Sequence, residues 1–203
     1  MNKRLLAAAL ASAFAANAHA FLITVEPDDF THEQNISALT PGVTLQWVSG
    51  SPVYAYETDD FEYASTGTRV FGYDAGFGVE PYWDDENQFR ADFAGWVNYV
   101  SIDVVNNDEE GDNDSAYMEV YGVSGLLATV YTNGISFPGF ETLSFYEGTV
   151  NISYILMSSA DGADYNLDRM EFGIPAAPTL ALFSLGLLGL ASTRARVGGP
   201  RRL

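Results

Sequence analysis

Carboxylates dominate the side chains of this sequence that could do chemistry. The chain has 27 aspartates and glutamates, two histidines and no cysteine. Only His32 remains after the predicted removal of residues 1–20, so schemes that depend on cysteine lack their nucleophile, those that depend on histidine have a single candidate, and zinc sites built from histidine and cysteine are excluded. Two carboxylates alone can hydrolyse a glycosidic bond, but a chain with so many acids always holds some pair at a workable distance. We therefore expect a protein that is not an enzyme, with a carboxylate-based glycoside hydrolase as the weaker alternative.

Aromatic rings and hydrogen-bonding groups occur together between Tyr82 and Gln88. Flat rings next to carboxylates and amides are the groups that a sugar-binding surface uses. Tyr82 and Trp83 follow a proline and precede an acidic turn, which predicts a loop, so we expect these two rings to bind a glycan. The alternative is ordinary packing, because rings that alternate along strands more often belong to the core.

The densest acidic stretch runs from Asn106 to Asp114. Taken as an EF-hand loop it has oxygen-bearing residues at positions 1, 3 and 5 and Gly111 at position 6. Position 12 is then Tyr117 rather than the glutamate that such loops need, so the EF-hand assignment fails. A looser calcium site and a solvated hairpin loop both stay open.

The elements that must position these groups are strands. Short runs of β-branched and aromatic residues recur through the middle of the chain, with turn residues between them. We expect strands at Phe21–Val25, Val43–Val48, Val53–Tyr56, Arg69–Tyr73, Gln88–Phe93, Asn98–Val105, Ala116–Tyr121, Leu126–Tyr131, Glu141–Tyr146, Asn151–Met157 and Asn166–Phe172. A spacing of roughly 8–12 residues predicts an all-β domain over residues 21–173, a single antiparallel β-sandwich or jelly roll.

The charge of this middle part restricts its partners. Residues 21–173 hold all 27 acidic residues and only three basic ones, a formal charge of −24: Arg69, Arg90 and Arg169. A field of this sign repels nucleic acid and anionic lipid, so neither is expected as a partner. The absence of cysteine means that the domain does not depend on disulfides.

Both ends of the chain are predicted to be targeting segments. Two basic residues, an apolar run over residues 5–16 and the small residues Ala18 and Ala20 predict a signal peptide over residues 1–20 that is cleaved before Phe21. At the other end residues 174–193 are uncharged and long enough, about 30 Å as a helix, to cross a membrane. We expect a transmembrane helix over about residues 176–193, and the arginine-rich tail 194–203 favours a cytoplasmic C-terminus.

The start of this last segment has a recognisable order. Ile174, Pro175, Ala176, Ala177 and Pro178 are followed by a glycine-containing apolar stretch and an arginine cluster. This order resembles the PEP-CTERM sorting signal of exported proteins in Gram-negative bacteria that produce exopolysaccharide. The resemblance implies sorting by an exosortase-type processing enzyme. The usual Pro-Glu-Pro is replaced here by Pro-Ala-Ala, with the next proline one position later.

Several short strings in the middle resemble the jelly-roll ectodomains of PEP-CTERM proteins, which are related in shape to carbohydrate-binding modules. They are Glu26–Phe30, Gly42–Leu45, Met118–Leu127, Phe140–Leu143 and Asn166–Gly173. This resemblance implies a structural calcium ion that joins the first and last strands. Asp168 alternates with apolar residues and should point inward, where a carboxylate needs a partner or a cation. Asp28 or Asp29 could supply the other end of the site, and pairing of Asp168 with Arg169 or backbone amides is the alternative.

Together these features predict a non-enzymatic protein that is exported across the inner membrane. We expect it to be anchored in the membrane before processing, and to lie at the cell envelope or outer surface, or to be secreted, after it. Its expected partners are the membrane, an exosortase-type enzyme and extracellular polysaccharide or matrix. The first alternative is a glycan-binding surface protein of the carbohydrate-binding-module type. A self-associating surface protein whose acidity only maintains solubility is the contrasting possibility.

Overall fold

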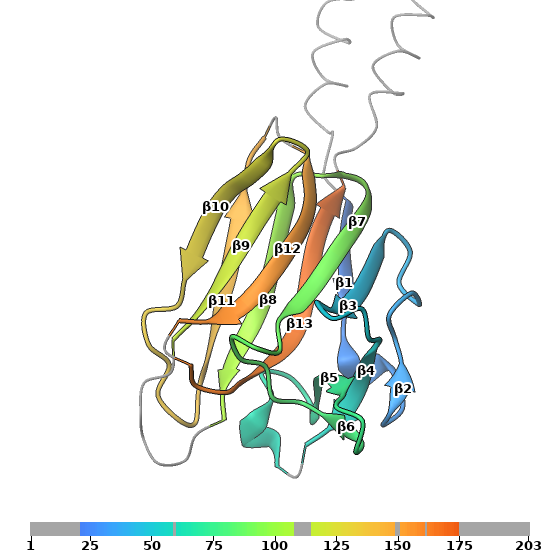
Figure 1. The fold of residues 1–203 in the computed structure, drawn as a ribbon, viewed down its shortest axis with the longest axis vertical. Helices are drawn as coiled ribbons and strands as arrows, with labels where there is room; N and C mark the ends of the chain where they lie inside the picture. Colours follow the sequence, from blue (N-terminus) through green and yellow to red (C-terminus); the bar gives the residue numbers. More distant parts are fainter. Residues whose placement is uncertain (1–20, 59, 108–114, 149–150, 161, 175–203) are drawn as a thin grey trace, which may run out of the picture. The chain divides into compact units, whose positions relative to one another are not determined.

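The computed structural model describes residues 21–58, 60–107, 115–148, 151–160 and 162–174. Residues 22–174 form one compact unit built from two antiparallel β-sheets (Figure 1), so the prediction of an all-β sandwich is confirmed. The predicted signal peptide, the sorting motif from Pro175 onward and the predicted transmembrane helix lie outside the described residues. Within the described part, no helix is long and apolar enough to cross a membrane.

The larger sheet has eight strands. Its order is β11-β8-β13-β5-β4-β2, with β1 paired to β13 and β6 paired to β5. Its strands are β1 (Phe21–Val25), β2 (Gln34–Asn35), β4 (Val53–Glu57), β5 (Arg69–Asp74), β6 (Val79–Glu80), β8 (Tyr99–Asn106), β11 (Phe140–Tyr146) and β13 (Tyr165–Ile174). Two short 3-10 helices, η1 (Pro27–Asp29) and η2 (Phe61–Tyr63), lie in the connections after β1 and β4.

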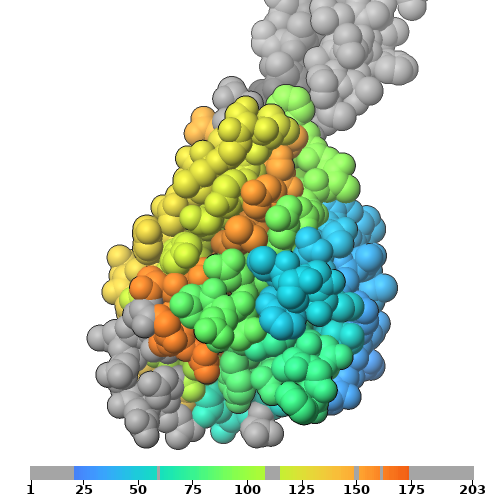
Figure 2. Space-filling view, viewed as in Figure 1, coloured from blue at the N-terminus to red at the C-terminus, as the bar shows by residue number. Residues whose placement is uncertain are grey.

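The smaller sheet has five strands in the order β10-β9-β12-β7-β3. They are β3 (Val43–Trp47), β7 (Phe89–Val97), β9 (Ala116–Gly122), β10 (Gly125–Tyr131) and β12 (Ile152–Ser159). In β9 every second residue is buried, as the period-2 geometry of a strand requires when one face covers a core. The opposite face of this sheet is turned toward the viewer in Figure 1, and Figure 2 shows its side chains as a continuous surface over β9, β12 and β7.

Trp83 belongs to the core and contacts residues of both sheets. It is completely buried, and its ring contacts those of Tyr73 and Phe89 at centroid distances of 5.0 and 5.3 Å. Its indole Nε1 donates a hydrogen bond to the carbonyl oxygen of Phe71 at 2.8 Å. The expectation that Trp83 stacks on a sugar is therefore corrected: the ring is large and apolar enough to be drawn into the core, and its one polar atom is satisfied there.

Replacement of Trp83 by alanine should therefore act on stability. Loss of so large a buried ring leaves a cavity and removes the hydrogen bond to the Phe71 carbonyl, so we expect the free energy of unfolding to fall by about 3–5 kcal/mol. Urea denaturation measures this change. The matched control is Tyr82→Ala at the neighbouring position, where the side chain is 47% exposed and the loss should stay below about 1 kcal/mol. Equal losses in the two variants would contradict the core assignment.

Candidate functional site

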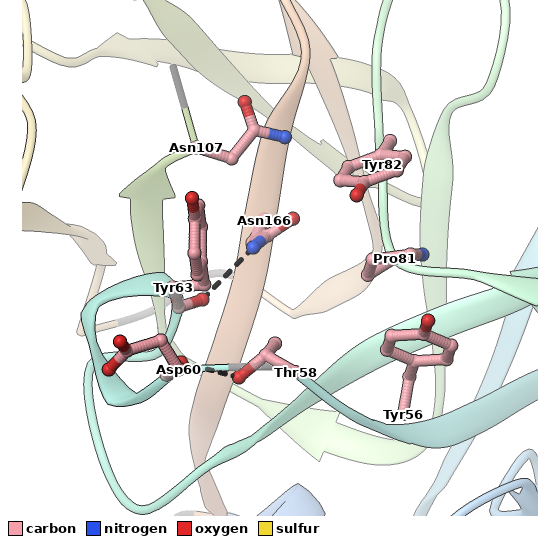
Figure 3. A pocket seen from close by; sticks show the side chains of 8 residues that line it. All are labelled: Tyr56, Thr58, Asp60, Tyr63, Pro81, Tyr82, Asn107 and Asn166. Atoms are coloured by element: carbon pink, nitrogen blue, oxygen red, sulfur yellow. Dashed lines mark hydrogen bonds between the residues drawn. The ribbon is translucent and has the colours of Figure 1, made fainter. Parts of the chain in front are cut away.

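A cavity of about 430 Å³ lies where the ends of β4 and β8, the helix η2, the β6–β7 connection and the start of β13 meet. These elements meet at the lower end of the sandwich as it is drawn in Figure 1. Three of its walls are tyrosine rings and the others are mostly amide and hydroxyl groups (Figure 3). The lining residues are Tyr56, Thr58, Asp60, Tyr63, Pro81, Tyr82, Asn107 and Asn166.

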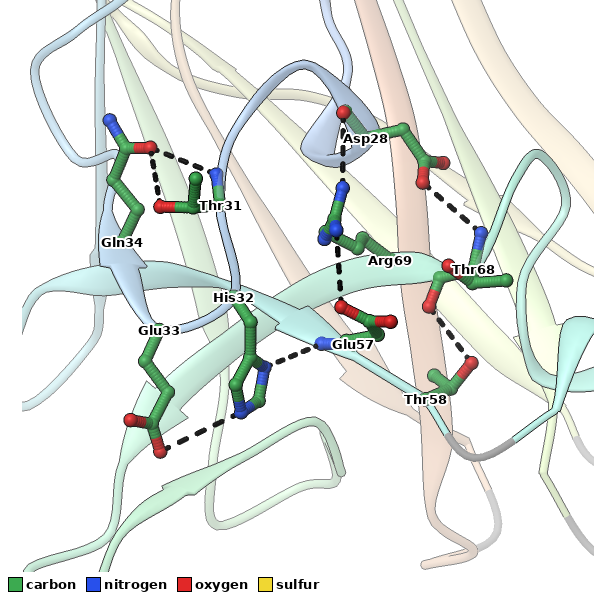
Figure 4. Close-up of polar contacts among 9 residues, drawn as sticks. All are labelled: Asp28, Thr31, His32, Glu33, Gln34, Glu57, Thr58, Thr68 and Arg69. Atoms are coloured by element: carbon green, nitrogen blue, oxygen red, sulfur yellow. Dashed lines mark hydrogen bonds and ion pairs between the residues drawn. The ribbon is translucent and has the colours of Figure 1, made fainter.

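The tyrosine rings are held by neighbours outside the cavity. The ring of Tyr56 contacts His32 edge-on at 5.3 Å, and the ring of Tyr63 lies 5.5 Å from Phe137. The Nδ1 atom of His32 accepts a hydrogen bond from the backbone N–H of Glu57 at 3.0 Å (Figure 4), which fixes the imidazole. The histidine next to the site therefore supports a ring and is not placed as a catalytic base.

Asn166 forms the floor between the rings. Its side chain is 1% exposed, and its Nδ2 donates a hydrogen bond to the backbone oxygen of Tyr63 at 3.0 Å. This bond determines which end of the amide is the donor, so the other end is the acceptor Oδ1. The Oδ1 atom has no hydrogen-bond donor within the described part of the protein. In Figure 3 it points toward the side on which Pro81 and Tyr82 lie, so an unpaired acceptor lies directly beneath the lining of the cavity.

A second cavity of about 370 Å³ adjoins the first, because Tyr82 and Asn107 line both. Asp164 and Ala163 complete its lining. Burial, followed by repulsion from Asp84 and Glu80, raises the pKa of Asp164 above its ordinary value. Asp164 is thus within electrostatic range of two further carboxylates, and no basic residue lines this cavity among the described residues.

A separate polar cluster surrounds Asp168, which is fully buried, in agreement with its inward alternation on β13. The Oδ2 atom of Asp168 accepts hydrogen bonds from the backbone N–H groups of Ser65 and Thr66 at 2.9 and 2.8 Å, and from the Ser65 hydroxyl at 2.8 Å. Its Oδ1 accepts the backbone N–H of Arg169 at 2.7 Å. The backbone amides of the loop after η2 thus satisfy the carboxylate, which ties this loop to the last strand.

The structure brings Asp28 to the same loop but leaves Asp29 exposed on the surface. Asp28 Oδ1 accepts the backbone N–H of Thr68 at 3.1 Å (Figure 4), while its buried Oδ2 has no donor among the described residues. Any side chain at Gly67 would collide with the Asp28 carboxylate, so the loop closes tightly over it. Glu26, which sequence reasoning missed, joins the cluster by accepting the Thr66 hydroxyl at 3.1 Å.

These carboxylates do not form a finished calcium cage. Among the described residues, no three acidic or histidine side chains are gathered closely enough to hold a metal ion. Asp168 is already saturated by N–H and O–H donors, and only Asp28 Oδ2 is left without one. Calcium at this place therefore stays a prediction, and Asp28 is the residue that would have to contribute to it.

Of the two rings predicted to bind a glycan, the structure places Tyr82 on the cavity and Trp83 in the core. Sequence reasoning missed Tyr56, Tyr63 and Asn166, which come from three different segments and carry no local signal. The densest acidic stretch falls largely on residues 108–114, outside the described residues.

Comparison with known proteins gives likeness of fold only. No family model and no curated protein sequence matches the chain. Among solved structures, the K2 cleaved adhesin domain of Lys-gingipain has a TM-score of 0.46 and 12% identity, covering 76% of this chain and 100% of that one. The CBM22-1 xylan-binding domain from Paenibacillus barcinonensis Xyn10C has a TM-score of 0.42 and 16% identity, covering 78% and 97%. TmCBM61, solved in complex with β-1,4-galactotriose, has a TM-score of 0.41 and 12% identity, covering 70% and 99%. At this level of similarity no ligand is carried over from any of them.

The cluster around Glu26 predicts a pH dependence of stability. Burial, followed by repulsion from Asp168 and Asp28, raises the pKa of Glu26 from 4.5 to about 7. The folded protein holds this proton more tightly than the unfolded chain, so the contribution to stability is present below about pH 4.5 and is lost as the pH rises through about 7. In a chelating buffer, we expect Glu26→Gln to reduce the fall in Tm between about pH 5 and pH 8.

The control for this titration is Glu147→Gln, which removes an exposed acid and should keep the wild-type slope. A Glu26→Gln profile as steep as that of the wild type would refute the assignment. Repeating the melts with calcium in place of the chelator tests the predicted ion, because an ion bound only by the native state must raise Tm. A Tm that calcium leaves unchanged, or a rise that Asp28→Asn retains, would remove the calcium prediction.

Proposed function

We propose that the β-sandwich domain is a glycan-binding module of an exported protein, and that the tyrosine-lined cavity holds part of a polysaccharide. The observation that carries this proposal is the buried Asn166 Oδ1, an acceptor without a protein donor that lies between three aromatic rings. A buried acceptor left unpaired costs about 1–3 kcal/mol, so a ligand with an O–H or N–H group in this place restores a favourable interaction.

A sugar unit matches the two kinds of group that line the cavity. Its ring has an apolar face of C–H groups, which stacks on tyrosine, and a rim of hydroxyls, which bond to amides and to other hydroxyls. The volume of about 430 Å³ falls within the range of ordinary small-ligand sites. The rings of Tyr56 and Tyr63 are held by His32 and Phe137 before a ligand arrives, so little freedom is lost on binding.

Binding rather than hydrolysis is the activity that we infer. Asp60 is the one carboxylate that lines the main cavity in the described residues, whereas glycoside hydrolysis needs an acid and a second carboxylate across the scissile bond. Asp164 lines the adjoining cavity and is not among the residues that line the main one.

The sequence of both ends supports a place for this module at the cell envelope. In the proposal, residues 1–20 direct export, the segment from Ile174 anchors the chain and is recognised by an exosortase-type enzyme, and the domain then engages extracellular polysaccharide. Intact mass spectrometry of the protein recovered from its host tests this route. We expect a species that begins at Phe21 and ends close to Pro175–Pro178; an intact chain that retains residues 1–20 would overturn export, and one that runs from Phe21 to Leu203 would overturn processing.

Replacement of Tyr82 by alanine tests the cavity itself. Loss of one stacking ring should weaken binding of a recognised polysaccharide about tenfold, a change of about 1.4 kcal/mol, with little effect on folding. Affinity electrophoresis against a panel of soluble polysaccharides, followed by calorimetry, measures this loss. The matched control is Tyr146→Ala, an exposed tyrosine at the end of β11, which should bind as the wild type does.

A second variant separates binding from stability. Asn166→Leu keeps the branching of the side chain and removes the unpaired acceptor, but it also removes the hydrogen bond from Nδ2 to the Tyr63 carbonyl, so Tm should fall by several degrees at most while binding falls about tenfold. Retention that persists at high salt distinguishes stacking and hydrogen bonding from charge-driven self-association, which salt weakens. Binding that neither variant changes would overturn the assignment of the cavity.

A further inference from the structure

The arginines of the domain are all occupied by carboxylates. Arg69 is paired with Glu57 at 3.1 Å (Figure 4), Arg90 with Asp92 at 2.6 Å, and Arg169 Nε lies 3.5 Å from Asp103. Residues 21–173 contain no lysine, and no basic residue lines either cavity among the described residues. A glycan that carries uronate or sulfate would therefore meet no free cation at this site.

Besides the hydroxyl and amide groups of its lining, the site offers one unpaired acceptor and one carboxylate in the adjoining cavity. Asn166 Oδ1 needs a donor, and Asp164 lines the adjoining cavity beyond Tyr82. Asp84, which repels Asp164, is held in place because its Oδ1 accepts the backbone N–H of Glu86 at 2.7 Å and its Oδ2 the side-chain amide of Asn87 at 2.9 Å. The protein thus keeps negative charge beside the ring instead of letting the carboxylates move apart.

We propose that the sugar in this site carries a free amino group, so that the ligand class is a cationic or zwitterionic polysaccharide containing de-N-acetylated hexosamine. The inference rests on the proposed glycan-binding function and adds the chemical class of the ligand. A protonated amine supplies three N–H donors and no acceptor, which suits a site that presents an unpaired amide oxygen and a carboxylate. The faces of the tyrosine rings attract the same positive charge.

Other classes of ligand fit the groups of this site less well. An N-acetylated sugar brings an amide in place of the charge, so it gains the stacking but not the attraction to Asp164. A uronate would bring a negative charge next to Asp164, Asp84 and Glu80, which repel it. A bare divalent cation would fill the acidic side and leave the rings unused.

The test compares oligosaccharides that differ only in their amino groups. Calorimetry in a chelating buffer is carried out with the full domain and glucosamine oligomers, N-acetylglucosamine oligomers of the same length, and oligomers containing glucuronate. We expect the free-amine oligomers to bind at least tenfold more tightly than the N-acetylated ones, and glucuronate oligomers to bind least. Asp164→Asn should weaken binding of the free amine about fivefold and leave the N-acetylated ligand unchanged.

The matched control is Glu147→Gln. It removes one exposed negative charge after β11, next to the start of β8 and thus at the opposite end of that strand from Asn107, so it should not alter the preference. Equal affinity for amine and N-acetyl oligomers, both lost in Tyr82→Ala, would overturn the amino-sugar inference and leave glycan binding intact. If both Tyr82→Ala and Asp164→Asn still prefer the amine, the preference arises from the net charge of the domain, and this result would also overturn the amino-sugar inference. Binding to none of the oligomers or polysaccharides would overturn both proposals.

Discussion

The site depends on the pairing of Trp83 with the start of the last strand. The backbone N–H of each residue donates to the other's carbonyl, from Trp83 to Tyr165 at 2.9 Å and from Tyr165 to Trp83 at 3.0 Å, while the indole is anchored on β5 through Phe71. Because successive side chains alternate, burial of Trp83 turns Tyr82 outward and places it near Asn166, the residue after Tyr165. The position of Trp83 therefore determines the positions of both Tyr82 and Asn166 in the cavity lining, so the geometry of the site depends on the packing of the core.

Negative charge is managed in two different ways in this domain. Around Asp168 the protein surrounds a buried carboxylate with amides and hydroxyls of the loop after η2, so the charge serves to tie that loop to β13. Beside Tyr82 the carboxylate of Asp164 lines the adjoining cavity and is repelled by Asp84 and Glu80, and no basic residue lines that cavity among the described residues. The carboxylate of Asp168 is thus stabilised by hydrogen bonds from the protein. The carboxylate of Asp164 has no cationic partner among the described residues that line its cavity, and this contrast supports the proposal that a positively charged ligand binds there.

The three arginines explain why no anion-binding function follows from the aromatic cavity. Arg90 is the most strongly held, since it contacts both oxygens of Asp92 and lies over the ring of Tyr154 at 3.9 Å. Arg69 joins Glu57 to the backbone oxygen of Asp28 and so stabilises the connections around β4 and β5. Because these three arginines are paired with carboxylates of the domain, the surface stays negatively charged. Such a surface repels anionic partners and attracts cationic ones.

Composition and alternation determined the class of the fold. Each of the eleven segments predicted as a strand is one, because β-branched and aromatic runs between turn residues have few other stable arrangements. The strands that were missed, β2 and β6, have two residues each, too few for a periodic signal. The identity of the site was decided only by the tertiary structure. Trp83 and Tyr82 are chemically similar neighbours in the chain, and which one enters the core depends on pairing with Tyr165, 82 residues further along; Tyr56, Tyr63 and Asn166 converge only when two sheets and their connections have closed.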